Sequence, residues 1–335
     1  MRQRIGVIGG GSWGTALGKL LAEKGYPVSL WMHEATHSRE LSDKRENALY
    51  LPGILLPDNL VPTSDLQEAV AGKTVLLCAV PSHVLRSVMA RVAPLVVGSP
   101  LVVSASKGIE DETSKTMVGV LKDLLPGVLQ TRMCALSGPS FAREVARGMP
   151  TAVTAAAAAE VAAVECQTTF TTAFFRVYTS TDVVGVELGG AVKNVIAIAA
   201  GVSDGLGFGH NSRAALVTRG IAEIARLGSR MGADPRTLAG LAGVGDLVLT
   251  CTSDLSRNRN VGVRLGRGER LSDILAGMRM IAEGVRNAKS VYHLARKLEV
   301  EMPITEQMYL LLHEEKSPRQ VVVDLMTRDL KPEIY

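Results

Sequence analysis

The sequence predicts an α/β domain followed by a domain built only of helices. In the first half of the chain, short β-branched runs alternate with helical patterns, which is typical of a parallel sheet whose strands are joined by crossover helices. After about residue 180, β-branched runs become scarce and long segments with a 3.6-residue period take over. With 335 residues, the chain is also too long for one ordinary domain. We therefore expect domains at residues 1–180 and 181–335.

The apolar runs of the first half predict the strands of the sheet and the helices between them. Several runs are apolar throughout, as in strands that helices cover on both faces. The alanine-rich stretch 155–163 is predicted to be helical, because alanine has the highest helix propensity. We expect strands at residues 4–8, 28–32, 74–80, 101–105, 133–137 and 151–154, and further helices at 15–24, 83–92 and 113–125.

The second half contains periodic segments that are long enough for helices. Asp182 precedes the first of them and can serve as its N-cap, because a short acceptor side chain there satisfies a free backbone N–H. No internal repeat or low-complexity linker interrupts the pattern. We expect helices at residues 182–200, 211–231, 271–278, 282–298 and 305–314.

Composition and charge narrow the possible partners. The formal charge of +4 and the pI near 8.9 come without long Lys/Arg runs, which argues against a nucleic-acid surface and favours a small anionic ligand. The four cysteines form no C-x-x-C pair, so we expect reduced thiols, a cytoplasmic protein and no metal site. Glycines break the first apolar run, and later runs are shorter than the roughly 20 residues of a membrane span. We therefore expect neither a signal peptide nor an integral membrane segment.

A glycine-rich turn joins the first predicted strand to the first predicted helix. In the segment RIGVIGGGSWG, Gly9, Gly11 and Gly14 fit the pattern G-x-G-x-x-G. The first glycine permits the tight turn, the second lets the backbone approach a pyrophosphate, and the third lets helix and strand pack closely. Phosphates then lie at the N-terminus of the helix. Because strand, glycines and helix occur together, the sequence predicts a Rossmann-type, dinucleotide-binding first domain.

The end of the second predicted strand bears on the choice of coenzyme. Glu34 stands roughly 20 residues beyond the glycines, where an acidic side chain would bind the adenosine ribose and favour NAD, whereas an arginine would favour NADP. His33 can contact the adenosine end, and Arg39 can swing in. Both His33 and Glu34 can equally be solvated loop residues. The expected coenzyme is therefore NAD or NADP.

One lysine, Lys193, stands among small apolar residues in the segment GGAVKNVIAIAAG. An ammonium group removed from water is costly unless something pairs with it. At a helix edge, the side chain can extend its charge into water. Alternatively, desolvation or a nearby cation lowers the pKa of the amine, as a general acid/base requires, and the small neighbours leave room for a substrate.

Four long motifs then point to one family: GGGSWGTAL, SGPSFAREV, GVELGGAVKNVIAIAAG and GLAGVGDLVLTCTSDLSRN. Over nearly its whole length, the chain closely resembles the bacterial-type NAD(P)-dependent glycerol-3-phosphate dehydrogenases. The resemblance implies reversible oxidation of sn-glycerol 3-phosphate to dihydroxyacetone phosphate, usually to supply glycerol phosphate for phospholipid synthesis. Members of this family are often dimers, so a homodimer is one expectation.

The resemblance also implies roles for residues on the substrate side. Lys193 is the general acid/base, and Lys107 contacts both substrate and cofactor and can help to depress the pKa of Lys193. Asp246 binds a substrate hydroxyl or pairs with Lys193, which would raise that pKa, and the sequence leaves the balance open. Ser256, Arg257 and Asn258 provide donors suited to a phosphate. The matching substrate positions are Lys107, Gly138, Ser140, Lys193, Asp246, Ser256, Arg257 and Asn258.

On the cofactor side, the resemblance implies contacts at the glycine turn and beyond it. From the residues alone, Tyr50 can equally be a core aromatic, Glu283 a surface residue of a helix, and Lys107 a solvated loop residue. Family members often carry arginine where this chain has Glu34. The matching cofactor positions are Gly9, Gly11, Ser12, Trp13, Gly14, His33, Glu34, Tyr50, Lys107, Ala142, Arg257, Ile281 and Glu283.

Two other functions stay open at this point. A related two-domain β-hydroxyacid dehydrogenase would use the same lysine on a helix, and the donors of residues 256–258 suit its carboxylate substrate as well as a phosphate. A non-catalytic dinucleotide-binding protein would bind NAD without turnover. That second alternative leaves Lys193, Lys107 and Arg257 without a role.

Overall fold

The computed structural model describes residues 3–278 and 282–333. Its first half forms an eight-stranded sheet with the strand order β3-β2-β1-β4-β5-β6-β7-β8. Strands β1 to β6 run parallel to one another, β7 is antiparallel to β6, and β8 is parallel to β7. The strands are β1 (Ile5–Ile8), β2 (Val28–Trp31), β3 (Leu60–Thr63), β4 (Val75–Cys78), β5 (Leu101–Ser104), β6 (Met133–Ser137), β7 (Thr151–Ala157) and β8 (Phe175–Ser180).

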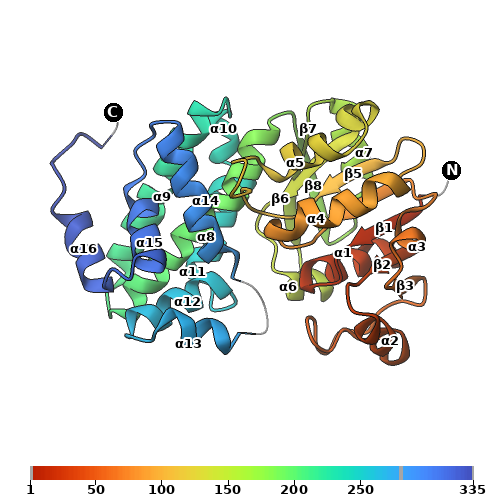
Figure 1. Cartoon of the computed structure of the whole chain (residues 1–335), viewed down its shortest axis with the longest axis horizontal. Helices are drawn as coiled ribbons and strands as arrows, with labels where there is room; N and C mark the ends of the chain where they lie inside the picture. Colours follow the sequence, from red (N-terminus) through yellow and green to blue (C-terminus); the bar gives the residue numbers. More distant parts are fainter. Residues whose placement is uncertain (1–2, 279–281, 334–335) are drawn as a thin grey trace.

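Helices cover both faces of this sheet, which confirms the predicted doubly wound α/β domain (Figure 1). On one face, Leu17 of α1 and Phe170 of α7 pack in the same core as Val7 of β1. On the other face, Leu85 of α4 packs in the same core as Ile8. Neighbouring residues of a strand point to opposite faces and so enter different cores. The helical segments of this half are α1 (Ser12–Glu23), α2 (Ala35–Lys44), α3 (Leu66–Val70), α4 (Ser82–Val92), η1 (Ala93–Leu95), α5 (Met117–Leu124), η2 (Gly127–Arg132), α6 (Ala142–Ala146) and α7 (Glu160–Phe170).

The predicted helix at residues 155–163 is wrong in its first part. Ala155, Ala156 and Ala157 belong to β7, and α7 begins only at Glu160. The three alanines are fully buried, and β7 pairs with β6 on one side and with β8 on the other. Pairing on both sides and burial outweigh the helix propensity of alanine at these positions.

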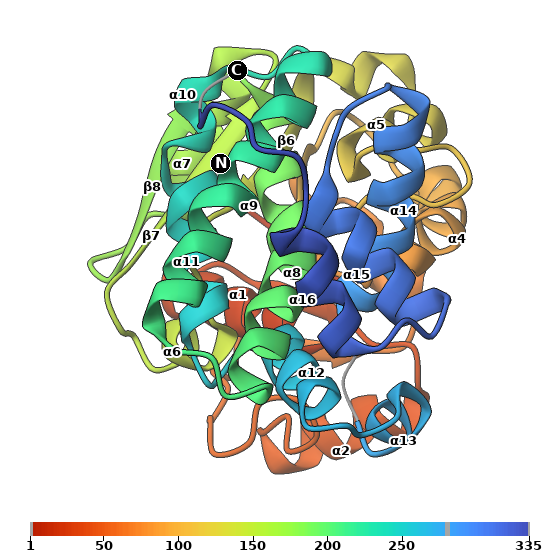
Figure 2. The ribbon, with the colours of Figure 1, turned by 90° about the vertical axis from the view of Figure 1, so that its left-hand side faces the viewer.

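The second half is the all-helical domain that the sequence predicts, built around the long helix α8 (Figure 2). Asp182 is the N-cap of α8, and its side chain accepts a hydrogen bond of 2.8 Å from the Gly185 N–H. Helices α9, α11, α12, α14 and α15 pack against α8. The helical segments are α8 (Val183–Gly205), α9 (His210–Arg230), α10 (Pro235–Leu238), η3 (Leu241–Gly245), α11 (Asp246–Thr252), α12 (Arg257–Gly266), α13 (Leu271–Ala276), α14 (Glu283–Lys297), α15 (Pro303–His313) and α16 (Pro318–Met326).

Two helical stretches are apolar enough for a membrane span by length and composition among the described residues. One is α8, and the other is a bent pair formed by Pro235–Thr252 and Arg257–Gly266. In α8, 89% of the most apolar window is buried inside the protein. A helix that is apolar on all sides and surrounded by other helices has the composition of a core helix.

Glycines allow α8 and α12 to touch along their backbones. A Cβ atom built on Gly262 of α12 would lie 2.1 Å from the Ile198 carbonyl oxygen of α8. One built on Gly201 of α8 would lie 2.0 Å from a carbonyl oxygen of α12. Gly205 and Gly266 repeat this arrangement one turn further along. The glycine contact fixes α12, and therefore its N-terminus, against the middle of α8.

Candidate active site

The glycine-rich turn after β1 has the geometry that the pyrophosphate motif requires. Gly9 has a φ of +121°, which residues with side chains rarely adopt. A Cβ on Gly14 would lie 1.8 Å from the Gly9 carbonyl oxygen, so α1 packs directly on the turn. A Cβ on Gly11 would meet no atom within 4 Å, and the first turn of α1 contains no acidic residue. The open N-terminus of α1 therefore fits the phosphates of a dinucleotide.

Four of the predicted cofactor residues lie beside this turn. Ser12 donates from its Oγ to the Tyr50 carbonyl oxygen over 2.6 Å. The half-buried side chains of Trp13 and Ala142 pack against one small apolar cluster between α1 and α6. The Tyr50 ring is half-buried and its centroid lies 5.3 Å from that of His37, so Tyr50 is not a core aromatic.

The residues expected to select the coenzyme follow β2 at the surface. β2 is the neighbour of β1 in the sheet, so its carboxyl end lies beside the glycine turn. His33 and Glu34 are both exposed. Glu34 occupies the N-cap position of α2, but its side chain makes no capping hydrogen bond. Its carboxylate is therefore accessible to a ligand that approaches along the turn.

Lys193 lies in the middle of α8, and its amine is bound inside the protein. The residue is 8% exposed, and its Nζ donates to Asp246 Oδ1 over 2.5 Å and to Thr250 Oγ1 over 2.9 Å. This geometry does not fit a charge that extends into solvent from a helix edge. Burial lowers the pKa of Lys193 to about 8, against the attraction of Asp246 and with the repulsion of Lys107. Of the two neighbours whose balance the sequence left open, Asp246 has the stronger effect, and it is burial that brings the pKa below its ordinary value.

Asp246 connects Lys193 to a second lysine from the sheet domain. Lys107, in the loop after β5, donates to Asp246 Oδ2 over 2.7 Å and to the Gly138 carbonyl oxygen over 3.2 Å. That carbonyl oxygen also accepts from Ser140 Oγ over 2.9 Å. Asp246 is 1% exposed. The structure therefore joins these predicted substrate residues in one hydrogen-bonded group, and we call Lys107, Lys193 and Asp246 the lysine–aspartate cluster.

Glycines of α8 make this cluster sterically possible. A Cβ on Gly190 would lie 2.7 Å from Ser137 Oγ, and one on Gly189 would lie 2.2 Å from the Ala242 carbonyl oxygen. Ala242 belongs to the π-helical turn η3, which ends directly before Asp246. Turns of this kind are frequent at functional sites, because the inserted residue changes the direction of its neighbours. Here α8 approaches both β6 and η3 at backbone distance.

The three predicted phosphate donors sit at the start of α12 in different environments. Ser256 is the N-cap, and its Oγ accepts a hydrogen bond from a backbone N–H of the first turn. Asn258 is buried, donates to Asn194 Oδ1 over 2.9 Å and accepts from a backbone N–H of α14 over 2.9 Å. Arg257 is exposed. Because Asn194 directly follows Lys193, this link places the start of α12 beside the lysine–aspartate cluster.

Glu283 lies between the sheet and the helical domain. Its carboxylate accepts from Ser82 Oγ over 2.7 Å and from the Ser82 N–H over 3.3 Å at the start of α4. Burial raises the pKa of Glu283, while the hydrogen bonds from Ser82 and the charge of Arg257 oppose the shift. Glu283 is therefore not a solvent-exposed residue on the surface of a helix. Ile281, another predicted cofactor residue, lies outside the described residues.

The sequence analysis missed four polar residues that contact predicted site residues or their elements: Thr250, Asn194, Ser82 and Asn287. Two of them have a signal in the sequence. Thr250 stands four residues after Asp246, so both lie on one face of a helix. Asn194 is the other polar residue in the apolar segment around Lys193.

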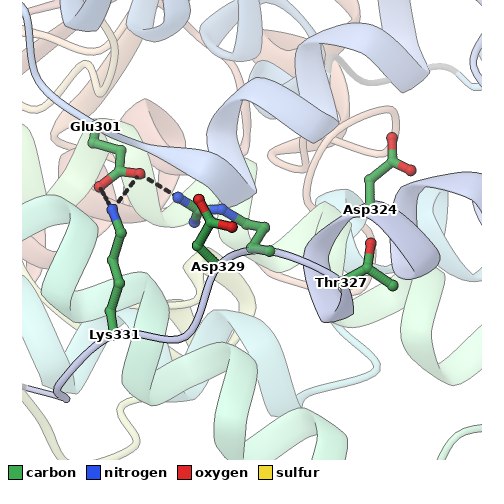
Figure 3. Close-up of a pocket in the computed structure, with 6 residues that line it drawn as sticks. Glu301, Asp324, Thr327, Asp329 and Lys331 are labelled. Atoms are coloured by element: carbon green, nitrogen blue, oxygen red, sulfur yellow. Dashed lines mark hydrogen bonds and ion pairs between the residues drawn. The ribbon is translucent and has the colours of Figure 1, made fainter.

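A surface hollow at the far end of the helical domain shares no residue with this site (Figure 3). Glu301 forms ion pairs with Arg328 and Lys331 across it. The hollow is lined by Glu301, Asp324, Thr327, Arg328, Asp329 and Lys331. Within residues 3–278 and 282–333, no group of three His, Cys, Asp or Glu side chains could hold a metal ion.

Comparison with known proteins finds relatives along nearly the whole chain. The family models of the NAD-dependent glycerol-3-phosphate dehydrogenase N-terminus and C-terminus match residues 4–163 and 182–323. The glycerol-3-phosphate dehydrogenase (NAD(P)+) of Citrifermentans bemidjiense is 59% identical over 333 residues, which is 99% of either chain. The crystal structure of the Coxiella burnetii glycerol-3-phosphate dehydrogenase is 41% identical with a TM-score of 0.94, covering 98% of this chain and 99% of its own. The yeast glycerol-3-phosphate dehydrogenase structure is 27% identical with a TM-score of 0.82, covering 98% and 100%.

Proposed function

Because the chain belongs to the NAD-dependent glycerol-3-phosphate dehydrogenase family, we propose that Lys193 is the general acid/base of its reaction. The reaction is the reversible, NAD(P)-dependent oxidation of sn-glycerol 3-phosphate to dihydroxyacetone phosphate. One observation carries the assignment: the Lys193 amine is buried and bound to Asp246 and Thr250 at the centre of the molecule. Interconversion of an alcohol and a ketone needs a group that takes a proton from oxygen and returns it.

The cluster divides this proton chemistry among its members. Bound NAD(P) supplies the hydride chemistry at C2 of the substrate. In the oxidation, neutral Lys193 accepts the proton of the C2 hydroxyl, and in the reduction the charged amine returns it. Burial makes the neutral form accessible. Asp246 and Thr250 hold the Lys193 nitrogen in place. Lys107 binds the same Asp246 and can donate a hydrogen bond to a substrate oxygen.

The start of α12 suits the phosphate of the substrate. Free backbone N–H groups and the helix dipole favour an anion there, and the first turn of α12 contains no acidic residue. The planar guanidinium of Arg257 can donate to two phosphate oxygens at once. Asn258 ties this helix end to Asn194, next to Lys193. The phosphate and the reacting carbon thus have separate anchors on α12 and α8.

The cellular role that fits this activity is the supply of glycerol 3-phosphate for phospholipid synthesis in the cytoplasm. All four cysteines are buried and unpaired, which suits a reducing compartment. A homodimer stays an expectation from the family resemblance, and sedimentation of the purified chain measures it directly.

A coupled spectrophotometric assay tests the function. Dihydroxyacetone phosphate should support oxidation of NADH or NADPH, run side by side, whereas ketones derived from β-hydroxyacids should not. Turnover with those ketones alone would identify a related hydroxyacid dehydrogenase. Binding of NADH without turnover of any substrate would identify a non-catalytic dinucleotide-binding protein.

The rate should depend on pH with opposite signs in the two directions. Because the oxidation needs neutral Lys193 and burial lowers its pKa to about 8, kcat for glycerol 3-phosphate oxidation should rise as the pH passes about 8. The reduction needs the charged amine, so its kcat should fall over the same range. Initial rates at saturating substrate between about pH 6 and pH 10 measure both profiles. Two profiles with the same sign would exclude a single titrating acid/base.

Exchange of Glu34 for arginine should shift the coenzyme preference towards NADPH. The carboxylate repels a 2′-phosphate, and a guanidinium at the same exposed position would bind it. We expect the ratio of kcat/KM for NADPH to that for NADH to rise roughly tenfold or more in Glu34→Arg. Glu40→Arg, an exposed site further along α2, is the control with the same change of charge. An equal change of this ratio in both variants would mean that the added positive charge acts at a distance and that Glu34 does not contact the coenzyme.

A further inference from the structure

Asn287 lies in the second turn of α14, where the helical domain meets the sheet domain. Its side chain is 1% exposed. The amide nitrogen Nδ2 donates to the Ala191 carbonyl oxygen of α8 over 3.2 Å. The amide oxygen faces Gly108, since a Cβ built on that glycine would lie 3.0 Å from Asn287 Oδ1. Among the described residues, no donor reaches Oδ1.

These two contacts join the elements that carry the two lysines of the cluster. Ala191 precedes Lys193 by two residues on α8, and Gly108 directly follows Lys107 in the loop after β5. The Asn287 side chain therefore lies between helix and loop, where it shares the space beside Gly108 with Ser82, whose Oγ would lie 2.6 Å from the same Cβ. The same loop is held by α14 at a second point, where Lys289 pairs with Asp111 over 3.1 Å.

Packing alone does not account for an amide at this position. Buried polar atoms nearly always have a hydrogen-bond partner, and an unpaired one is costly. A leucine has a similar volume and would fill the space without any unpaired polar atom. The amide differs from leucine in its bond to Ala191, which fixes the direction of the side chain against Gly108.

We propose that Asn287 is a positioning residue for the reaction, which keeps Lys107 against Asp246 and Lys193 by bridging Ala191 and Gly108. The proposal rests on the roles proposed above for Lys193 and Lys107. In this role Asn287 acts through the position of Lys107 and not on the substrate.

The consequence should be visible in the pH profile. The titratable groups that act on Lys193 are Asp246 and Cys251 of α11, which raise its pKa, and Lys107, which lowers it. If Lys107 moves away, its repulsion weakens and the pKa of Lys193 rises. Oxidation of glycerol 3-phosphate then needs a higher pH.

The test measures kcat against pH in full-length Asn287→Leu and Asn287→Ala. The acid limb of the oxidation profile should move to higher pH by about 0.5 to 1 unit in both variants. Ser290→Ala is the control, because Ser290 is also buried on α14 but donates only to Arg286 within its own helix. Its profile should coincide with that of the unchanged chain. Folding of each variant is checked by thermal unfolding, and the leucine variant preserves the volume if alanine does not fold.

A double variant tests whether Asn287 changes the pH profile by way of Lys107. In Lys107→Ala the profile should already be shifted, and adding Asn287→Leu should cause no further shift, because the two changes act at one step. Unshifted profiles in both Asn287 variants, or a full additional shift in the Lys107→Ala background, would overturn the proposal. Normal turnover of Lys193→Ala would overturn a different proposal, the role of Lys193 as the general acid/base.

Discussion

Replacement of Lys193 by alanine is expected to lower kcat by roughly 10²-fold or more, as is typical of the loss of a general acid/base. The amine that accepts the proton of the C2 hydroxyl is then missing, and Asp246 and Thr250 are left without the group that they hold. KM for the coenzyme should change little, because the glycine turn is untouched. Steady-state kinetics in both directions measure kcat and KM separately.

Two further variants separate proton transfer from charge. Lys193→Arg keeps a positive charge but cannot release its proton in the accessible pH range, so it should stay inactive at every pH. Lys19→Ala removes a lysine that pairs with Glu23 within α1, outside the lysine–aspartate cluster, and should keep the kcat of the unchanged chain. Normal turnover of Lys193→Arg would mean that the lysine contributes charge and that another residue exchanges the proton.

Gly262→Ala is expected to cause a large loss of stability. The added methyl group would lie 2.1 Å from the Ile198 carbonyl oxygen and 2.8 Å from the Val202 nitrogen, and neither backbone atom can turn aside. Overpacking of this kind costs about 3 kcal/mol or more when the backbone must move. Because α12 carries Arg257 and Asn258 at its start, its displacement should also raise KM for the phosphate substrate.

Thermal unfolding of Gly262→Ala should therefore occur at least about 5 °C below that of the unchanged chain. Gly277→Ala is the matched control, because its Cβ would lie 3.6 Å from the nearest atom, an ordinary contact distance. An unchanged unfolding temperature and KM in Gly262→Ala would show that α8 and α12 are further apart in solution than backbone contact requires.

Much of the fold follows from the sequence because its signals are local. The apolar runs of β1, β4, β5 and β6 and the periods of α8 and α9 are readable without knowledge of neighbours. The two strands at the edges of the sheet lack such signals. β3 contains Pro62, and β8 alternates buried and exposed residues such as Val177 and Tyr178, so neither forms a continuous apolar run. In β7, the alanines favour a helix locally, and only the partner strands on both sides make them a strand.

The site residues differ in the same way: local signals mark some of them, and only contacts between distant segments mark the others. The glycine turn is a local motif, and its geometry follows from Gly9, Gly11 and Gly14 themselves. Lys193 stands out because its own helix is apolar. Its partner Thr250 is 57 residues away in the chain, and the contact between Asn287 and Ala191 spans 96 residues. Such pairs depend on how helices pack, and no periodicity in one segment contains that information.

The reversal of the last two strands determines how the sheet domain connects to the helical domain. β8 is separated from β6 by β7 and ends level with the middle of β6, since Ser180 pairs with Ala156, which pairs with Ala135. A two-residue turn follows, and α8 then runs along β6 until Gly190 lies against Ser137 at the carboxyl end of that strand. The connection between the two domains is thus a continuous helix that packs on the sheet, and not a flexible loop. Because one uninterrupted helix both packs on β6 and carries Lys193, the Lys193 amine is tied to the sheet through a single rigid element.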